Sequence, residues 1–162
     1  MNIARIPVGL TLFVTLALTP PLAGAQYALT EATMESVESV AFGECWWLAE
    51  HAEPKPTDRT QFERQCRDSL APKIVEQRRL LGEAEKQLAT EYAQLSTALK
   101  AQGRIRPRSL LLSQRNWAKF RDAHCTLEVE RVMGNYRSPH RLATCLEVEA
   151  TKRIEYLKGF AG

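Results

Sequence analysis

Apolar residues recur at helical spacing along much of the chain. Between residues 74 and 95 leucine or isoleucine returns every seven positions, and two further apolar residues fill positions four residues on. Such spacing aligns side chains on one face of an α-helix. The residues of this stripe are Ile74, Leu81, Leu88, Tyr92, Leu95 and Leu99. We therefore expect one long helix over about residues 57–102, kinked near Pro72, because proline lacks a backbone N–H.

The rest of the pattern predicts three more helices and no sheet. From residue 26 onward there is no run of alternating Val, Ile, Thr or Tyr of the kind that forms half-buried strands. Helix-forming segments extend over about residues 30–50, 109–133 and 138–158, and short breaks separate them. Short connections place neighbouring helices antiparallel. The predicted fold is therefore all-α, an antiparallel bundle of about four helices.

Polar residues mark the predicted helix starts. Thr30, followed by Glu31, supplies a capping hydroxyl and an acidic first turn for the first helix. Asp58 provides a cap for the long second helix. Ser138 precedes Pro139 at the start of the last helix, where the missing N–H of proline does no harm.

The N-terminus has the three parts of a secretory signal peptide. A positive charge at Arg5 precedes an apolar stretch from Ile6 to Leu18, and small residues follow up to Ala25. The apolar stretch is shorter than the roughly 20 residues of a membrane-spanning helix. We expect residues 1–25 to be removed as a signal peptide and residues 26–162 to form a single domain. No cysteine stands where a lipoprotein would need it, so the expected product is periplasmic or secreted and carries no lipid.

All four cysteines lie in the expected mature chain, and an even number in an exported protein indicates two disulfide bonds. In an antiparallel helical pair, residues at equal distances from the turn face each other. The midpoint of Cys45 and Cys66 falls in the first predicted turn, and that of Cys125 and Cys145 falls in the last. This favours those two pairs over the two other connectivities. No CxxC or HExxH motif points to a metal site, so we expect no metal and no cofactor.

Charge is distributed unevenly along the expected mature chain. Residues 26–54 contain six glutamates and no Lys or Arg, whereas residues 55–121 hold 15 basic and 7 acidic residues. An acidic segment beside a basic one could steer a charged partner. The two segments could equally neutralise each other within the fold.

The densest local pattern lies in the third predicted helix. On a helix Trp117, Arg121 and Cys125 lie four residues apart and share one face. Phe120 lies beside them. One interpretation is structural: Trp117 and Phe120 fill the core, while a carboxylate, of Asp122 or of the last helix, holds Arg121. The other interpretation is that Arg121 is an exposed ligand-binding group.

This pattern resembles the signature of the LprI-type lysozyme inhibitor domain family. The resemblance is specific from Gln114 onward, whereas Cys45 and Cys66 match in type and order alone. The family's domain is a small exported helical module, so the resemblance implies that fold and the inhibition of lysozyme. A basic loop over residues 104–108 departs from the usual pattern. The matching residues are Gln114, Trp117, Phe120, Arg121, Asp122, Cys125, Cys145, Arg153 and Leu157.

Inhibition requires a rigid element that enters the lysozyme cleft, where two carboxylates cleave the glycan. The turn before the last predicted helix lies between two of the cysteines and offers amide, phenol, guanidinium and hydroxyl donors. The same residues also suit an ordinary helix connection. The residues of this candidate partner-binding turn are Asn135, Tyr136, Arg137 and Ser138.

The first predicted helix offers two further candidate features. Trp46 and Trp47 are adjacent, so one indole can enter the core while the other stays partly exposed, although both could be buried near Cys45. Four glutamates could form an acidic surface for a basic lysozyme or an ordinary solvated face. They are Glu31, Glu35, Glu38 and Glu44.

A second hypothesis assigns a different partner: a periplasmic immunity or adaptor protein that binds a toxin or an envelope complex. An enzyme is a weaker interpretation, because the sequence has no G-x-S-x-G, P-loop or paired-cysteine redox motif. The basic loop lacks the interleaved aromatic residues of a nucleic-acid groove. We expect a binding protein whose partner is a lysozyme or other cell-wall-active enzyme, with no nucleic-acid partner and no membrane span.

Overall fold

A computed structural model describes residues 35–103, 107–134 and 136–161. The predicted signal peptide and its cleavage site lie outside these ranges. The described residues form four helices and no strand, which confirms the predicted all-α fold. The helices are α2 (Val37–His51), α3 (Arg59–Ala101), α4 (Pro107–Met133) and α5 (Pro139–Ala161).

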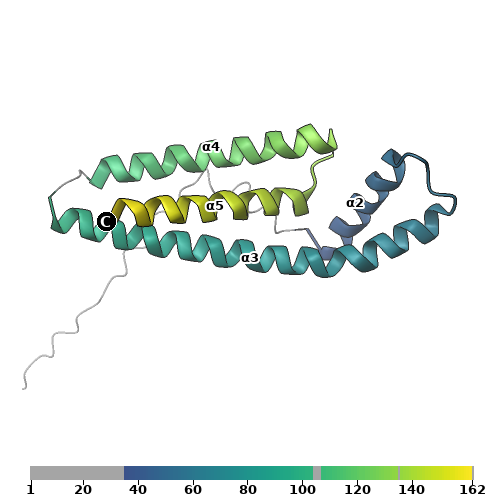
Figure 1. The fold of residues 1–162 in the computed structure, drawn as a ribbon, viewed down its shortest axis with the longest axis horizontal. Helices are drawn as coiled ribbons and strands as arrows, with labels where there is room; N and C mark the ends of the chain where they lie inside the picture. Colours follow the sequence, from purple (N-terminus) through teal and green to yellow (C-terminus); the bar gives the residue numbers. More distant parts are fainter. Residues whose placement is uncertain (1–34, 104–106, 135, 162) are drawn as a thin grey trace, which may run out of the picture.

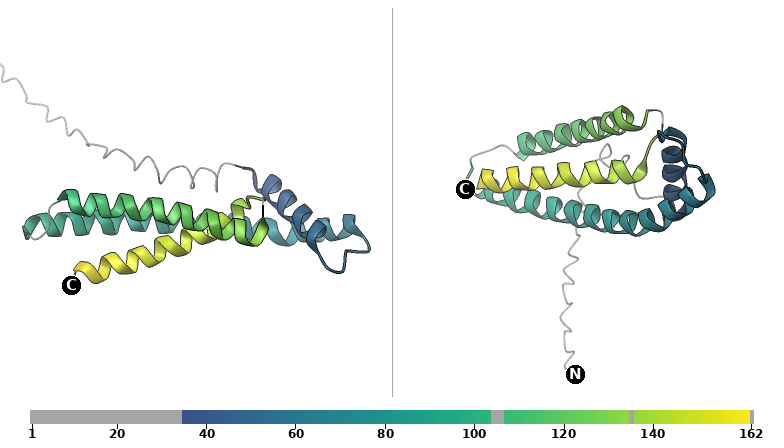
Figure 2. Two further views of the ribbon diagram at one scale, coloured as in Figure 1. Left: turned by 90° about the horizontal axis from the view of Figure 1, so that it is seen from above. Right: turned by 45° about the vertical axis from the view of Figure 1, so that its right-hand side comes forward.

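Helices α3, α4 and α5 form a bundle, and α2 packs across one end of it (Figure 1). Each connection is short, so α4 is antiparallel to both α3 and α5. α3 packs chiefly against α5 and α2, whereas α4 packs mainly against α5. Figure 2 shows the C-terminal half of α5 diverging from α3 and α4 when the bundle is seen from above. The N-terminal half of α5 packs on α3 and α4 through Leu142 and Leu146. The C-terminal half still packs on α3 through Ile154 and Leu157.

The apolar stripe of α3 forms the core of the bundle, as predicted. Its leucines and its isoleucine are all buried. Leu81 packs with residues of α4 and α5 such as Met133 and Leu146, and Leu88 packs with Ile154 of α5. Ile74, at the start of the stripe, instead meets α2. Three helices therefore pack against the stripe at different points along its length.

The predicted kink at Pro72 takes the form of a curve. α3 continues unbroken through Pro72 over 43 residues. Its first third curves toward α2 (Figure 1). Pro72 lies on the exposed side of the helix, and a proline in a helix interior removes one backbone hydrogen bond and bends the axis. The helix bends at this end and does not restart.

Two helix starts differ from the sequence prediction. α2 begins at Val37 and not near Thr30, because the Ser36 hydroxyl caps it by accepting a 3.1 Å hydrogen bond from the Ser39 amide. Thr30 itself lies outside the described residues.

α4 begins two residues before the predicted Ser109, at Pro107. Proline loses no helical hydrogen bond at the first position of a helix. The predicted caps at Asp58 and Ser138 are confirmed, since their side chains accept hydrogen bonds from the amides of Gln61 at 2.9 Å and Arg141 at 3.1 Å.

Both predicted disulfides are present. Cys45–Cys66 joins α2 to α3 with a Cα separation of 5.8 Å, and Cys125–Cys145 joins α4 to α5 with a Cα separation of 5.5 Å. The bridges link cysteines 21 and 20 positions apart in sequence. In the chain-entropy model a loop of this size stabilises the fold by about 3 kcal/mol. Each bridge therefore fixes one helical hairpin.

Among the described helices, none combines the length and the apolar character needed to span a bilayer.

Candidate functional site

Arg121 is the centre of a contact network that joins α3 and α4. Its side chain is buried, and its guanidinium forms ion pairs with Glu85 of α3 and with Asp122, the latter at 2.8 Å. Its Cζ atom lies 5.1 Å from the centre of the Trp117 ring. A buried guanidinium between two carboxylates connects helices but is closed to an external ligand. Of the two interpretations of Arg121, the structural one fits this geometry.

The two carboxylates beside Arg121 are partly removed from water. Burial raises the pKa of Glu85 and the pKa of Asp122, although the guanidinium of Arg121 acts in the opposite direction. The second oxygen of Asp122 is buried and accepts no hydrogen bond from the described residues. We expected a partner for Arg121 at Asp122 or on the last helix, and the second carboxylate instead comes from α3. A sequence signal for it existed: Glu85 lies four residues after Leu81 and three before Leu88, two residues of the apolar stripe.

Arg153 extends the network from α4 to α5. Its Nε donates a 3.1 Å hydrogen bond to the Gln114 side chain. Its Cζ lies 5.6 Å from the Trp117 ring centre and 4.9 Å from that of Tyr156. Leu157, one turn further along α5, is buried in the core. These motif residues therefore hold the three bundle helices together.

Phe120 is an exception among the motif residues. We expected it to fill the core, but its side chain is 61% exposed and stacks on His124, with ring centres 5.6 Å apart. α4 meets its neighbours through the face that carries Ala118 and Cys125, which are buried. Phe120 lies to the side of that face, so it points outward.

The candidate partner-binding turn packs closely against α2. Ser138 is buried, and its hydroxyl donates a 2.7 Å hydrogen bond to the Glu44 carboxylate while it caps α5. The other oxygen of Glu44 lies 3.4 Å from Nε of Arg141. Glu44 is only 3% exposed, so it does not contribute to an acidic surface. The Glu44–Ser138 contact fixes the turn on α2.

Tyr136 also lies against α2. Its hydroxyl is so near Gly43 that a Cβ atom on this glycine would lie 2.6 Å from the oxygen. Burial, together with the nearby charges of Glu44 and Glu35, raises the pKa of Tyr136 to about 12. Arg137, between the two docked side chains, is exposed. Asn135 lies outside the described residues.

The two adjacent tryptophans of α2 differ in burial. Trp47 packs against the core and stacks on His51, with ring centres 4.1 Å apart, whereas Trp46 is 46% exposed. Arg59 lies over the Trp46 ring, 5.9 Å from its centre. Phe42, one turn before Trp46, is exposed as well.

The aromatic side chains of α2 and the neighbouring Tyr136 form a surface that we call the aromatic end of the molecule. An open hollow of about 580 Å³ lies within it, between α2 and the turn that precedes α5. The aromatic end therefore brings together the candidate turn and the exposed indole, which are far apart in sequence. Its residues are Phe42, Trp46, Trp47, His51 and Tyr136.

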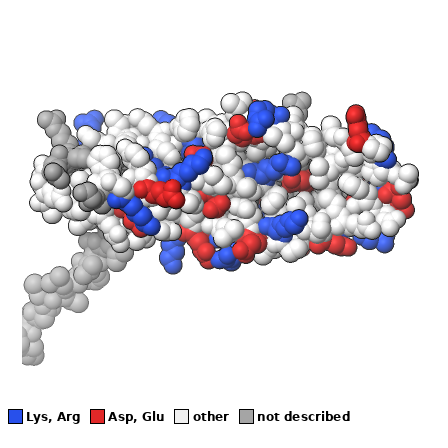
Figure 3. Space-filling view, viewed as in Figure 1, with Lys and Arg blue, Asp and Glu red and all other residues white. Residues whose placement is uncertain are grey.

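Charges of both signs are interspersed over the face of the molecule drawn in Figure 3. Ion pairs join the acidic first segment to later helices: Glu50 of α2 pairs with Arg59, and Glu44 pairs with Arg141. Of these two pairs, Glu50–Arg59 joins the acidic segment to the basic one, which favours mutual neutralisation over a single-sign surface.

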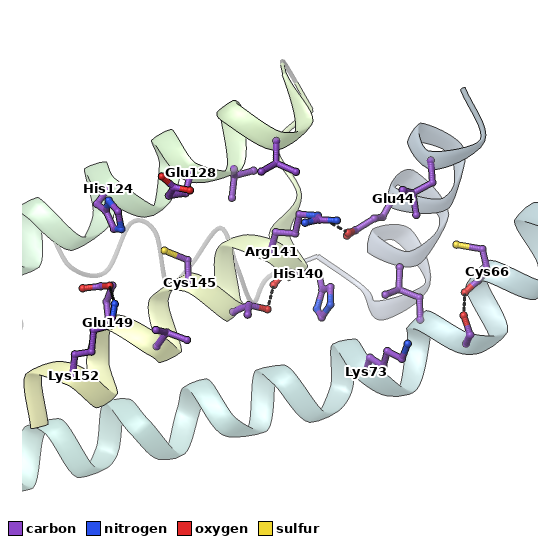
Figure 4. A pocket seen from close by; sticks show the side chains of 17 residues that line it. Glu44, Cys66, Lys73, His124, Glu128, His140, Arg141, Cys145, Glu149 and Lys152 are labelled. Atoms are coloured by element: carbon purple, nitrogen blue, oxygen red, sulfur yellow. Dashed lines mark hydrogen bonds and ion pairs between the residues drawn. The ribbon is translucent and has the colours of Figure 1, made fainter. Parts of the chain in front are cut away.

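A second open hollow, which we call the α5 hollow, lies over the N-terminal half of α5 and has a volume of about 720 Å³ (Figure 4). All four helices contribute to its lining. His140 points from α5 toward α3, on the side where Lys73 lies (Figure 4). The Nδ1 atom of His140 is buried and has no hydrogen-bond partner among the described residues. Burial lowers the pKa of His140, Glu44 acts to raise it, and Arg141 and Lys73 act to lower it.

Neither hollow contains metal-binding chemistry. Within the part of the chain that the structure describes, no three His, Cys, Asp or Glu side chains are grouped in a way that could hold a metal ion.

Comparison with known proteins identifies one family. The family model described as "Lysozyme inhibitor LprI" matches residues 75–157. No curated protein and no solved structure matches the chain. The matched segment contains the Arg121 network and the Cys125–Cys145 bridge, and it excludes α2. Because the match covers just over half of the 162 residues, the chain belongs to the lysozyme inhibitor LprI family.

Proposed function

We propose that this protein is exported and blocks a cell-wall-degrading glycosidase, and that it binds this enzyme through the aromatic end. The observation that carries the proposal is the juxtaposition of the exposed Trp46 with the docked turn around Tyr136. Family membership supports an inhibitor-like role, and the surface supplies a place for the contact.

The chemistry of the aromatic end suits an inhibitory contact. Tryptophan, tyrosine and arginine are enriched among residues that dominate binding energy at protein interfaces. Trp46 is exposed, Tyr136 borders the same hollow, and Arg137 follows Tyr136 on the exposed side of the turn. A glycosidase cleft holds two carboxylates. Guanidinium donors on the exposed side of the turn can satisfy such carboxylates by hydrogen bonds.

Rigidity of the turn favours tight binding. Ser138 is anchored to Glu44, and the Cys125–Cys145 bridge joins the two helices on either side of the turn. A segment that is already held in place loses less conformational entropy when it binds. The turn is therefore suited to enter a cleft without refolding.

Export is supported by the disulfides and by the sequence of the N-terminus. Both cysteine pairs are bridged, and structural disulfides persist in oxidising compartments such as the periplasm or the extracellular space. We propose that cleavage after Ala25 releases the mature chain into such a compartment.

The direct test adds purified, oxidised residues 26–162 to lysozymes of several classes and follows the lysis of cell-wall suspensions. We expect at least one lysozyme to be slowed at micromolar inhibitor concentrations. If the folded protein slows none of them at these concentrations, lysozyme inhibition is rejected.

Matched variants test whether the aromatic end makes the contact. Trp46→Ala should weaken inhibition by about tenfold or more, as for a typical interface anchor. Phe120→Ala removes another exposed aromatic side chain, on α4, and should leave inhibition unchanged. Arg137→Ala should weaken inhibition, whereas Arg131→Ala, which removes an exposed side chain from the last turn of α4, should not. Equal effects within each pair would reject the aromatic end as the binding surface.

One observation also favours an immunity or adaptor protein whose partner is a toxin or an envelope complex. The helix that carries Trp46 lies outside residues 75–157, the segment that the family model matches. The surface that it forms need not bind the same enzyme as other family members. Capture of a host envelope protein by wild-type chain but not by Trp46→Ala, without any effect on lysozymes, would support this function.

A further inference from the structure

We propose that the α5 hollow binds a single-headed amphiphile: one carboxylate group on an unbranched apolar chain. The proposal goes beyond inhibition of a glycosidase and does not depend on it. The α5 hollow and the hollow of the aromatic end share no lining residue.

One end of the α5 hollow has a surplus of positive charge. Lys73 from α3 and Arg141 from α5 line it together with a single carboxylate, Glu44. Glu44 already accepts a hydrogen bond from Ser138 and pairs with Arg141. Lys73 has no ion pair with any of the described residues. One monovalent anion would therefore balance this end of the hollow.

The other end of the hollow is electrically balanced. Glu149 pairs at 2.7 Å with Lys152, which also lines the hollow (Figure 4). Glu128 pairs at 2.8 Å with Arg131, which lies outside the lining. These pairs leave no charge for a second ionic group of the ligand. The charge distribution thus fits one anionic head and not two.

Apolar side chains supply a surface for the chain of the ligand. Val132 of α4 and Val148 of α5 are 43% and 41% exposed although they line a concave surface. Leu48 and Leu70 line the side formed by α2 and α3. The volume of about 720 Å³ lies within the usual range for small-molecule sites. Along α5 the lining runs from His140 to Lys152, which at 1.5 Å per residue is roughly 18 Å.

His140 adds a donor at the charged end. Its buried Nδ1 atom lacks a hydrogen-bond partner among the described residues, and a bound carboxylate could accept a hydrogen bond from the ring. The groups around the ring are Glu44 from α2, Lys73 from α3 and Arg141 from α5, while α4 contributes Glu128 and His124 to the same hollow. A bound anion adds negative charge there, so it should raise the pKa of His140.

The test titrates the oxidised mature protein with dodecanoate and follows heat by calorimetry and His140 by NMR. We expect saturable binding and an upward shift of the His140 pKa. Butyrate, which has the head without the chain, and dodecanol, which has the chain without the head, should each bind at least tenfold more weakly. Equal binding of dodecanol, or no binding of dodecanoate, overturns the proposal. Dodecyl phosphate tests the head group, and binding at least tenfold tighter than that of dodecanoate would overturn the assignment to a monocarboxylate.

Paired variants locate the site. Lys73→Gln should weaken dodecanoate binding about tenfold, whereas Lys86→Gln, on the exposed side of the same helix, should leave it unchanged. Val148→Asn should weaken it, whereas Val75→Asn, exposed on α3 outside the hollow, should not. Trp46→Ala should affect neither ligand binding nor the His140 shift. Equal losses in both members of a pair would overturn the assignment to this hollow.

Discussion

Ser138, at the start of α5, donates a 2.7 Å hydrogen bond to Glu44 of α2, 94 positions earlier in the sequence, and both side chains are buried. The bond joins the hairpin that carries Cys45–Cys66 to the hairpin that carries Cys125–Cys145. No disulfide connects these two hairpins, because each bridge lies within one of them. Their relative position therefore rests on noncovalent contacts such as this one.

Ser138→Ala should lower the free energy of unfolding by about 1–3 kcal/mol, because it leaves a buried carboxylate without its donor and removes a helix cap. Urea denaturation measures the change. Ser39→Ala, on the exposed face of α2, should change stability by less than about 0.5 kcal/mol. A similar small effect at both positions would show that the bond does not stabilise the docked turn.

Arg121→Met should lower the free energy of unfolding at neutral pH by about 3 kcal/mol, because Glu85 and Asp122 would remain as partly buried carboxylates without a cation. The loss should shrink as the pH falls and these carboxyl groups take up protons. Arg131→Met, which removes an exposed pair with Glu128, should have a much smaller effect on the free energy of unfolding. Chemical denaturation of both variants at several pH values provides the comparison.

His140 should make stability depend on pH in the interval from 6.5 down to its lowered pKa in the folded protein. Its pKa in the folded protein is lowered from the usual 6.5, mainly by burial. Its contribution to stability is therefore present above pH 6.5 and is lost as the pH falls through the folded pKa. His140→Gln should flatten the pH profile of the unfolding free energy in this interval. An unchanged slope in the variant would contradict the role of His140.

The raised pKa values of Glu85 and Asp122 have the opposite effect on the stability of the folded protein, which they increase as the pH falls. Protonation of these carboxyls favours the folded state, so their contribution increases as the pH falls through their folded pKa values. Glu85→Gln measured beside His140→Gln separates the two effects.

Gly43→Ala should displace the Tyr136 ring, because the new Cβ would lie 2.6 Å from the tyrosine hydroxyl. Gly82→Ala is the matched control: it lies in the exposed part of α3 with no atom within 4 Å of the new Cβ. Alanine in place of glycine inside a helix stabilises by about 0.5–1 kcal/mol, so Gly82→Ala should raise stability while Gly43→Ala gains less or loses. A lowered Tyr136 pKa in Gly43→Ala, measured by absorbance titration, would confirm the displacement.

The fold could be predicted because local patterns and packing agree. The stripe from Ile74 to Leu99 identified the buried face of α3, and the midpoints of the cysteine pairs identified both bridges. Helix starts were less certain, since both Thr30 and Ser36 carry capping hydroxyls. Only the position of the backbone shows that Ser36 is the cap.

The candidate site was harder to predict because it depends on contacts between distant residues. In the sequence, Glu44 looks like the exposed glutamates near it. No local pattern indicates that its carboxylate is buried and accepts a hydrogen bond from Ser138. Phe120 resembles a core residue, yet its position beside the buried face of α4 leaves it in solvent. Sequence periodicity indicates which face of a helix is buried. Which helix packs against that face depends on the tertiary arrangement.

The parallel arrangement of α3 and α5 has a consequence for how the chain matures. Ribosomes, and translocation channels that thread a chain N-terminus first, release α3 long before α5. Until α5 emerges, α2 can cover only the beginning of the α3 stripe, around Ile74. Leu88 and its neighbours toward the C-terminal end of α3 stay uncovered until Ile154 and Leu157 of α5 pack against them. A nascent chain therefore exposes a leucine face to which a chaperone can bind. Synthesis of the last helix is the step that ends this exposure.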